Sequence, residues 1–192
     1  MTALVLQTAV YVLSPDRTQV LLMHRNKWAE DIHLGKYLSL GGHVEPNEDV
    51  LTCARREVYE ESGLTTTDLT LQGTVLWTGF GAKRLDYLCF VFRADVFSGT
   101  PHDGNDEGTL EWVPIDDLAS RPMWDSDHLW LPMVFDDIAK PFYGVMPYDG
   151  TRCSAGRFSV EGSMISTRSS QSSTARPVLR ASTKVGRQGF EP

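Results

Sequence analysis

Three glutamates are crowded into one short stretch of this chain, Glu57, Glu60 and Glu61. On a helix with about 100° per residue they share an arc of about 100°, directly beside an apolar stripe. Carboxylates crowded at the edge of a buried face repel one another, and burial raises the cost. A hard divalent cation such as Mg²⁺ relieves that repulsion, because it takes carboxylate oxygens together with substrate phosphates.

Arg56 is the residue expected to orient this cluster. It lies one turn before Glu60 and can pair with it or with Glu48. Taken alone, a charged helix face of this kind is more often simply solvated. The fixed positions around it, a glycine before the helix and another after it, favour a metal site over a solvated face.

Nine positions of this segment match the Nudix box, G-x5-E-x7-R-E-U-x-E-E-x-G-U, in which U is a bulky aliphatic residue. The matching residues are Gly42, Glu48, Arg56, Glu57, Val58, Glu60, Glu61, Gly63 and Leu64. The segment therefore resembles the Nudix hydrolase superfamily. That resemblance implies an α+β fold, an α/β/α sandwich with a mixed sheet and the box as loop–helix–loop. It also implies hydrolysis of a nucleoside diphosphate linked to another group, with Mg²⁺ or Mn²⁺.

The same resemblance suggests metal ligands outside the helix. A backbone carbonyl of Gly41 is placed to reach a metal, and glycine suits a close approach there, although it also suits a turn alone. Glu107 stands in a loop where relatives often supply another glutamate, and Glu111 is its competitor. The predicted metal ligands are Glu57, Glu60, Glu61, Gly41 and Glu107.

For the chemistry, the resemblance implies a metal-bound water that attacks phosphorus. Glu60 and Glu57, with Arg56, are the predicted catalytic residues. The general base stays open between Glu60, Glu57 and Glu107. The expected reaction cleaves a nucleoside triphosphate to a monophosphate and pyrophosphate.

Aromatic and acidic residues alternate in a second segment, residues 122–132. Trp124 can stack on a base, and Asp125 or Asp127 can read a purine edge. The alternative is that the tryptophans are core and an aspartate caps the following helix. For Trp130 we favour the core.

Over residues 4–160 this pattern resembles the oxidised-purine nucleoside triphosphatases of the MutT type and their mammalian counterpart, which act on substrates such as 8-oxo-dGTP. In that subgroup the residue matching Trp124 stacks on the base, and the one matching Asp127 hydrogen-bonds its edge. A neighbouring aspartate of relatives falls at Ser126, where Asp125 is a substitute. Leu38 stands where the mammalian enzyme has an asparagine.

The opposite wall of this predicted base pocket is assigned to two aromatic residues. Phe80 and Trp77 follow the box on one strand, and core packing is an equal alternative for each. The predicted substrate-binding residues are Trp124, Asp127, Asp125, Leu38 and Phe80.

Composition restricts the partners. The 192 residues are 41% hydrophobic and 22% charged, as in ordinary globular proteins. A net charge of −7 disfavours non-specific binding to nucleic acid or to an anionic membrane. The resemblance implies a small nucleotide as partner, and monomer and homodimer both stay open.

The cysteines and the apolar segments indicate a cytoplasmic location. Cys53, Cys89 and Cys153 show no metal or disulfide spacing. The apolar start, residues 4–13, lacks a basic region and a cleavage site, and no run reaches membrane-spanning length.

The pattern along the chain predicts one domain over residues 1–160 and a disordered, basic, Ser/Thr-rich tail over residues 161–192. Asn47 or Asp49 is expected to cap the box helix and Gly63 to end it. Strands are expected at 4–13, 19–25, 37–40, 69–80, 85–96, 110–114, 142–148 and 153–160, a helical turn at 115–118, and a second helix at 131–139.

Two other functions stay open. A Nudix pyrophosphatase acting on ADP-ribose, a dinucleotide or another nucleoside diphosphate derivative carries the same box. A nucleotide-sensing module without catalysis is a third possibility, although such modules usually lose box glutamates.

Overall fold

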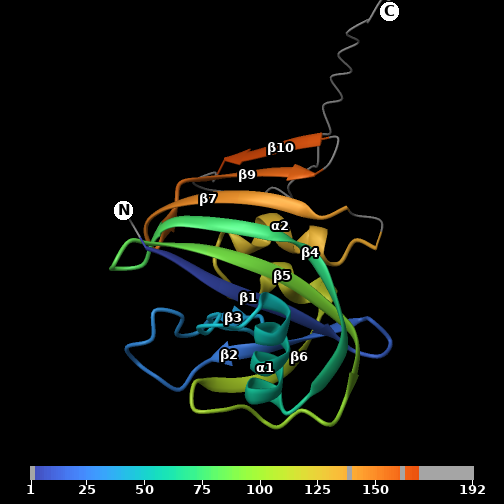
Figure 1. Ribbon diagram of the computed structural model, residues 1–192. Helices are drawn as coiled ribbons and strands as arrows, with labels where there is room; N and C mark the ends of the chain where they lie inside the picture. The colour runs from blue at the N-terminus through green and yellow to red at the C-terminus, as the bar shows by residue number, and fades with distance from the viewer. Residues whose placement is uncertain (1–2, 138–139, 161–162, 169–192) are drawn as a thin grey trace, which may run out of the picture.

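The structure is a computed structural model that describes residues 3–137, 140–160 and 163–168. A curled mixed sheet forms its centre, with helix α1 on one side and α2 on the other (Figure 1). The predicted α/β/α sandwich is confirmed.

The strands pair in the order β10-β9-β7-β4-β5-β1-β2-β3, with β6 on β2 and β8 on β7. The β1–β5 and β4–β7 pairs are parallel and the other pairs are antiparallel. The strands are β1 (Leu4–Leu13), β2 (Gln19–Arg25), β3 (Tyr37–Leu38), β4 (Thr65–Phe80), β5 (Leu85–Ser98), β6 (Gly108–Pro114), β7 (Phe142–Gly150), β8 (Arg152–Cys153), β9 (Ala155–Val160) and β10 (Ser163–Arg168). The helices are α1 (Val50–Ser62), α2 (Asp127–Val134) and the 3-10 helix η1 (Ile115–Ser120).

Strand β1 divides the core in two. Side chains alternate across a strand, so Val10 and Val12 face the α1 side, where Ala54 and Val58 are fully buried. Tyr11 faces the other side and packs edge-on against Trp130 of α2. Because helices cover both faces, the inner half of β1 is a continuous apolar run.

Helix α1 has the predicted ends. Asp49 caps it, and its carboxylate accepts hydrogen bonds from the backbone N–H groups of Leu51 (2.9 Å) and Thr52 (3.0 Å). Gly63 ends it in the left-handed region at φ 74°, and its N–H donates to the carbonyl of Tyr59.

The turn before α1 is held close to β1. Gly41 has φ 136°, and a Cβ there would lie 2.2 Å from the backbone oxygen of Thr8. Glycine is therefore required by the neighbouring strand itself. This contact fixes where the turn enters the site.

Two sequence predictions are wrong. The second helix covers Asp127–Val134 instead of 131–139, so Asp127 and Trp130, expected before it, lie in its first turn. Disorder from residue 161 does not hold for Ser163–Arg168, which pair with β9 as β10 and carry the sheet past the predicted boundary at 160. Residues 138–139, 161–162 and 169–192 lie outside the described part.

The predicted strand 153–160 is divided into β8 and β9, and the other predicted strands differ only at their ends. Strand β4 begins at Thr65, four residues earlier than expected, and β3 ends at Leu38, with Leu40 making an isolated bridge to Val10. Among the described residues, no helix is long and apolar enough to cross a membrane.

We expect Gly73→Ala to destabilise the fold by about 1–3 kcal/mol through overpacking. A Cβ at Gly73 would lie 2.3 Å from the backbone oxygen of Phe142 on β7. Urea denaturation measures the loss of unfolding free energy. The control is Thr70→Ala on the exposed part of β4, which should change it by about 0.5 kcal/mol or less. Equal effects of both changes would contradict the close packing.

Candidate functional site

A cavity of about 830 Å³ opens beside the turn that precedes α1. One part of its lining carries acidic side chains, Glu57 and Glu61 from α1 and Glu107 from the loop before β6. Another part is aromatic, with Trp124 and Phe80. The cavity thus joins the two segments that the sequence singled out.

Glu57 and Glu61 are the α1 acids that reach the cavity. Glu57 lies against Gly42, where a Cβ would come within 2.4 Å of its Oε1, so a larger residue would displace the carboxylate. Oε2 of Glu61 accepts a hydrogen bond from the Gly41 N–H at 2.8 Å. Burial raises the pKa of both carboxyls, that of Glu61 to about 8, and the charges of Glu57 and Glu107 raise the pKa of Glu61 further.

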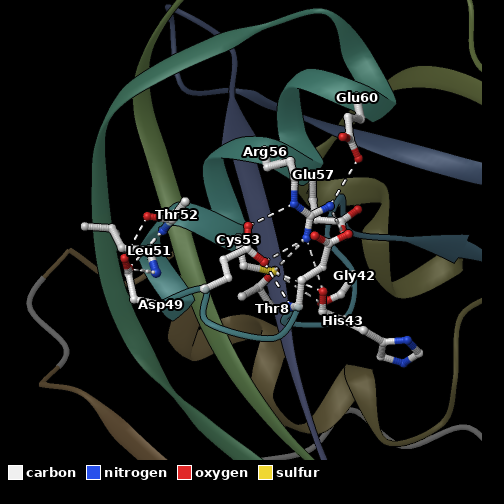
Figure 2. A network of polar contacts seen from close by, with 12 residues as sticks. Thr8, Gly42, His43, Asp49, Leu51, Thr52, Cys53, Arg56, Glu57 and Glu60 are labelled. Carbon is white, nitrogen blue, oxygen red and sulfur yellow. Dashed lines mark hydrogen bonds and ion pairs between the residues drawn. The ribbon is translucent and has the colours of Figure 1, made fainter.

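Arg56 is bonded to three glutamates at once. It donates to both oxygens of Glu48 (2.9 and 3.0 Å), to Glu57 (2.8 Å) and to Glu60 (3.1 Å). Figure 2 shows its guanidinium between Glu57 and Glu60, beside the backbone oxygen of His43. These bonds from Arg56 lower the pKa of Glu48 to about 2. The predicted pairing with Glu60 or Glu48 is confirmed for both residues.

Glu107 is held from the other side of the cavity. Arg25 donates to Glu107 through Nη1 and to Asp31 through Nε at 2.7 Å. The competitor Glu111 instead accepts from the Tyr37 hydroxyl at 2.8 Å and does not line the cavity. Of the two, Glu107 is the acid placed at the cavity.

The acids border the cavity without meeting at a single point. Among the described residues, no group of three or more His, Cys, Asp or Glu side chains is close enough to hold a metal ion. Arg56, Arg25 and the Gly41 N–H each hold one or more of the carboxylates apart. Glu60 is 57% exposed and does not line the cavity. For Gly41 the structure gives an N–H bond to Glu61, while its predicted carbonyl role stays a prediction.

Aromatic rings form the other part of the wall. Phe80 packs edge-on against Trp124 (centroids 5.3 Å apart) and against Tyr148 (4.9 Å). The Lys36 ammonium lies over the Trp124 ring, 4.5 Å from its centroid. Trp77 lines the cavity too. Trp130, 2% exposed, is part of the core as expected, and it also borders the cavity.

Asp127 is the buried acid of the aromatic part. It is 7% exposed, and burial raises its pKa to about 7. Ser126 donates to its Oδ1 at 3.3 Å and is hydrogen-bonded to the Tyr148 hydroxyl. The expected placement of Asp127 at the cavity is therefore found.

Two other predicted residues differ in their placement. Leu38 lines the cavity, as expected. Asp125 does not, because it lies in the turn before α2 and its side chain is exposed. Its expected place is taken by Ser126, which is buried and does line the cavity.

The sequence reasoning missed His33 and Tyr148 as lining residues. His33 comes from the loop between β2 and β3, and Tyr148 from the far end of β7. Neither has a spacing to the box or to Trp124 that marks it. Only the folded sheet brings these segments together.

The fold and the motif together define a class of protein. A family model described as NUDIX domain matches residues 5–133, and the chain belongs to the Nudix family. It is a Nudix hydrolase, and members of this family generally use a divalent metal and act on small nucleotide substrates.

Two relatives and one solved structure show which members of the family this chain resembles. The chain is 34% identical over 145 residues to the oxidized purine nucleoside triphosphate hydrolase of Danio rerio, covering 76% of this chain and 87% of the relative. With the protein of that name in Mus musculus it is 30% identical over 129 residues, covering 67% and 78%. The solved structure of a MutT protein from Bacillus halodurans superposes with a TM-score of 0.69 at 25% identity, covering 80% of this chain and 97% of that one.

The buried carboxyl of Glu61 makes stability depend on pH. Its pKa is about 8 in the folded protein against an ordinary 4.5, so between these values the folded state holds a proton that the unfolded state lacks. The free energy of unfolding therefore falls as the pH rises through this window, by at most about 1.4 kcal/mol per pH unit. Glu61→Gln removes this loss and can still accept from Gly41.

We expect the stability gain of Glu61→Gln over the unchanged protein to grow from about pH 5 to about pH 8. Chemical denaturation in EDTA at several pH values measures it. The matched control, Glu30→Gln at an exposed position, should give a flat difference. A flat difference for Glu61→Gln as well would show that this carboxyl is not buried in the folded protein.

Proposed function

We propose that this Nudix hydrolase cleaves a purine nucleoside triphosphate, with an oxidised purine such as 8-oxoguanine as its base, to the monophosphate and pyrophosphate. The observation that carries the proposal is the single cavity that joins the box carboxylates to an aromatic wall with a buried aspartate. The printed activity of the two relatives at 34% and 30% identity supports the choice of substrate.

The donor set fits Mg²⁺ or Mn²⁺. Glu57, Glu61 and Glu107 bring hard carboxylate oxygens to one part of the cavity, and a cation that draws them together would relieve the repulsion between them. Glu60, on the same helix, is proposed as a further ligand once it leaves Arg56. When bound, the metal neutralises the phosphates and lowers the pKa of a water molecule.

The chain's own groups position this chemistry. Arg56 fixes the Glu57 carboxylate by a 2.8 Å hydrogen bond and ties the loop at Glu48 to α1. Gly42 leaves the space that Glu57 occupies. The base that takes the proton of the attacking water is one of Glu57, Glu60 and Glu107. Preorganised charge of this kind supplies most of the rate in phosphoryl transfer.

The purine ring of the substrate is proposed to lie against Trp124, with Asp127 at the edge of that ring. Burial holds the pKa of Asp127 near neutrality, so its carboxyl is available as donor or as acceptor. Leu38 contributes an apolar surface. Ser126 stands where an aspartate of relatives is expected, and its hydroxyl is already bonded to Tyr148.

The reaction products distinguish a nucleoside triphosphatase from a pyrophosphatase that acts on ADP-ribose or a dinucleotide. We expect release of pyrophosphate and monophosphate from 8-oxo-dGTP in the presence of Mg²⁺, and none in EDTA. A panel with dGTP, dATP, ADP-ribose and dinucleotides, analysed by chromatography, provides the comparison. AMP and sugar phosphate from ADP-ribose as the main products would contradict the proposal.

Removing the box charges should abolish turnover without unfolding the protein. For Glu57→Gln and Glu61→Gln we expect kcat to fall about 100-fold or more, because each loses one anionic oxygen donor to the metal. Asp116→Asn, an exposed acid of η1, is the control and should keep its rate. Steady-state pyrophosphate release measures all three, and near-normal rates in both box variants would refute the site.

Loss of the indole should weaken substrate binding. Trp124→Ala removes a stacking surface of about 1–3 kcal/mol, so we expect KM to rise about tenfold or more. Trp28→Ala, at a tryptophan that is 58% exposed and outside the cavity lining, is the matched control. If both variants keep the KM of the unchanged enzyme, the base does not lie on Trp124.

A further inference from the structure

His33 is held in a defined position on the cavity wall by its own loop. Its backbone N–H donates to Oδ1 of Asp31 at 3.0 Å, and its carbonyl accepts from the Lys36 N–H at 2.9 Å. The other oxygen of Asp31 accepts from Arg25, and the side chains of this ion pair are only 7% and 13% exposed. The loop is therefore anchored on both sides of His33.

The imidazole ring belongs to the aromatic wall. It meets Trp124 edge-on, with centroids 5.6 Å apart at 87°, and lies nearly parallel to Phe80 at 6.3 Å. Nε1–H of Trp124 donates to Nδ1 of His33 at 3.0 Å. The ring thus has a fixed orientation as well as a fixed place.

This hydrogen bond determines where the imidazole carries its proton. An indole N–H only donates, so Nδ1 must be the unprotonated nitrogen and the hydrogen of the neutral ring is on Nε2. Burial lowers the pKa of His33, and the charges of Arg25 and Lys36 lower it further against the effect of Asp31. The neutral ring is the form expected at neutral pH.

The Nε2–H group is a donor without a partner among the described residues, on a cavity-lining side chain. The indole N–H groups of Trp77 and Trp130 belong to the same lining but are buried. Leu38 and Phe80 have no hydrogen-bonding atoms, and the Tyr148 hydroxyl is bonded to Ser126. A ligand against this wall therefore meets a donor at His33.

We propose that His33 determines base specificity, with its Nε2–H donating to an acceptor atom on the edge of a purine that lies in the cavity. The acceptor is a carbonyl oxygen or a ring nitrogen: guanine presents O6 and N7, whereas in 8-oxoguanine N7 carries a hydrogen and O6 remains the acceptor. This inference rests on the proposed function, because it takes the cavity to hold a purine nucleotide. It adds a base contact from the loop that precedes the box, 91 residues before Trp124 in the sequence.

Two variants of similar polarity separate the donor from the packing. In His33→Gln the side-chain amide nitrogen reaches about the place of Nε2, so the donor is kept. In His33→Asn the shorter amide reaches only the place of Nδ1, beside Trp124, and the Nε2 donor is lost. Circular dichroism and thermal unfolding check that both variants fold.

Equilibrium binding of purine nucleoside monophosphates is the measurement, by tryptophan fluorescence or calorimetry, with and without Mg²⁺. The ligands are dGMP, its 7-deaza analogue without the N7 acceptor, and the 2-aminopurine analogue without O6. We expect the unchanged protein and His33→Gln to bind dGMP about tenfold more tightly than the analogue that lacks the acceptor of the His33 bond. That preference corresponds to about 1.4 kcal/mol. His33→Asn should bind all three within about twofold.

Several outcomes overturn the proposal. They are an equal preference in the unchanged protein and His33→Asn, loss of the preference in both variants, and no preference or no binding in the unchanged protein. If a variant does not fold, ¹⁵N resonances of His33 in the unchanged protein decide. The Nε2–H signal should shift with dGMP and not with the analogue that lacks the acceptor, and an unshifted signal refutes the contact.

The measurement also separates this inference from the proposed reaction. Binding of monophosphates requires no turnover. A protein that discriminates through His33 but releases no pyrophosphate from purine triphosphates loses the proposed reaction and keeps the contact. A protein that releases pyrophosphate with the same base preference in His33→Asn keeps the reaction and loses the contact.

Discussion

The multiple ion pairs of Arg56 are the interaction on which the rest of the acidic site depends. Its guanidinium donates to Glu48 in the loop and to Glu57 and Glu60 on the helix, so one cation fastens the loop to α1. A lysine carries a single point of charge and has no planar fork to match this arrangement. The geometry explains why a glutamate before the helix and an arginine within it occur together in the motif.

The two glycines of the turn before α1 contribute by leaving room for close packing. A side chain at Gly41 would collide with β1, and one at Gly42 would collide with Glu57. The backbone therefore comes close enough for the Gly41 N–H to bond the buried Glu61 carboxylate. Close approach, one cation and a few N–H groups together keep several acids beside one cavity in a folded protein.

The box helix, its cap and its end were predictable from the sequence because they depend on neighbours within a turn or two. Asp49, Gly63 and the pairing of Arg56 follow from local rules of helix geometry. The pairing of β10 with β9 was not predictable, since a Ser/Thr-rich stretch has little apolar surface and its order comes from a neighbouring strand edge.

The aromatic wall shows the same division between local and distant causes. The segment around Trp124 stood out by its composition, but the start of α2 at Asp127 placed Asp125 in solvent and Ser126 at the cavity. Residues from the β2–β3 loop and from β7 complete the wall. Their sequence distance from Trp124 is set by the order of strands in the sheet, which no short pattern encodes.

The position of Lys36 has a consequence for how a flat molecule can be gripped. Its ammonium covers one face of the Trp124 indole and does not line the cavity, so at most the other face is open to an incoming ring. The tryptophan can then stack on a ligand from one side only. Stacking on one face does not fix the position or rotation of a planar ligand within its own plane. Contacts at the edge of its ring must fix both.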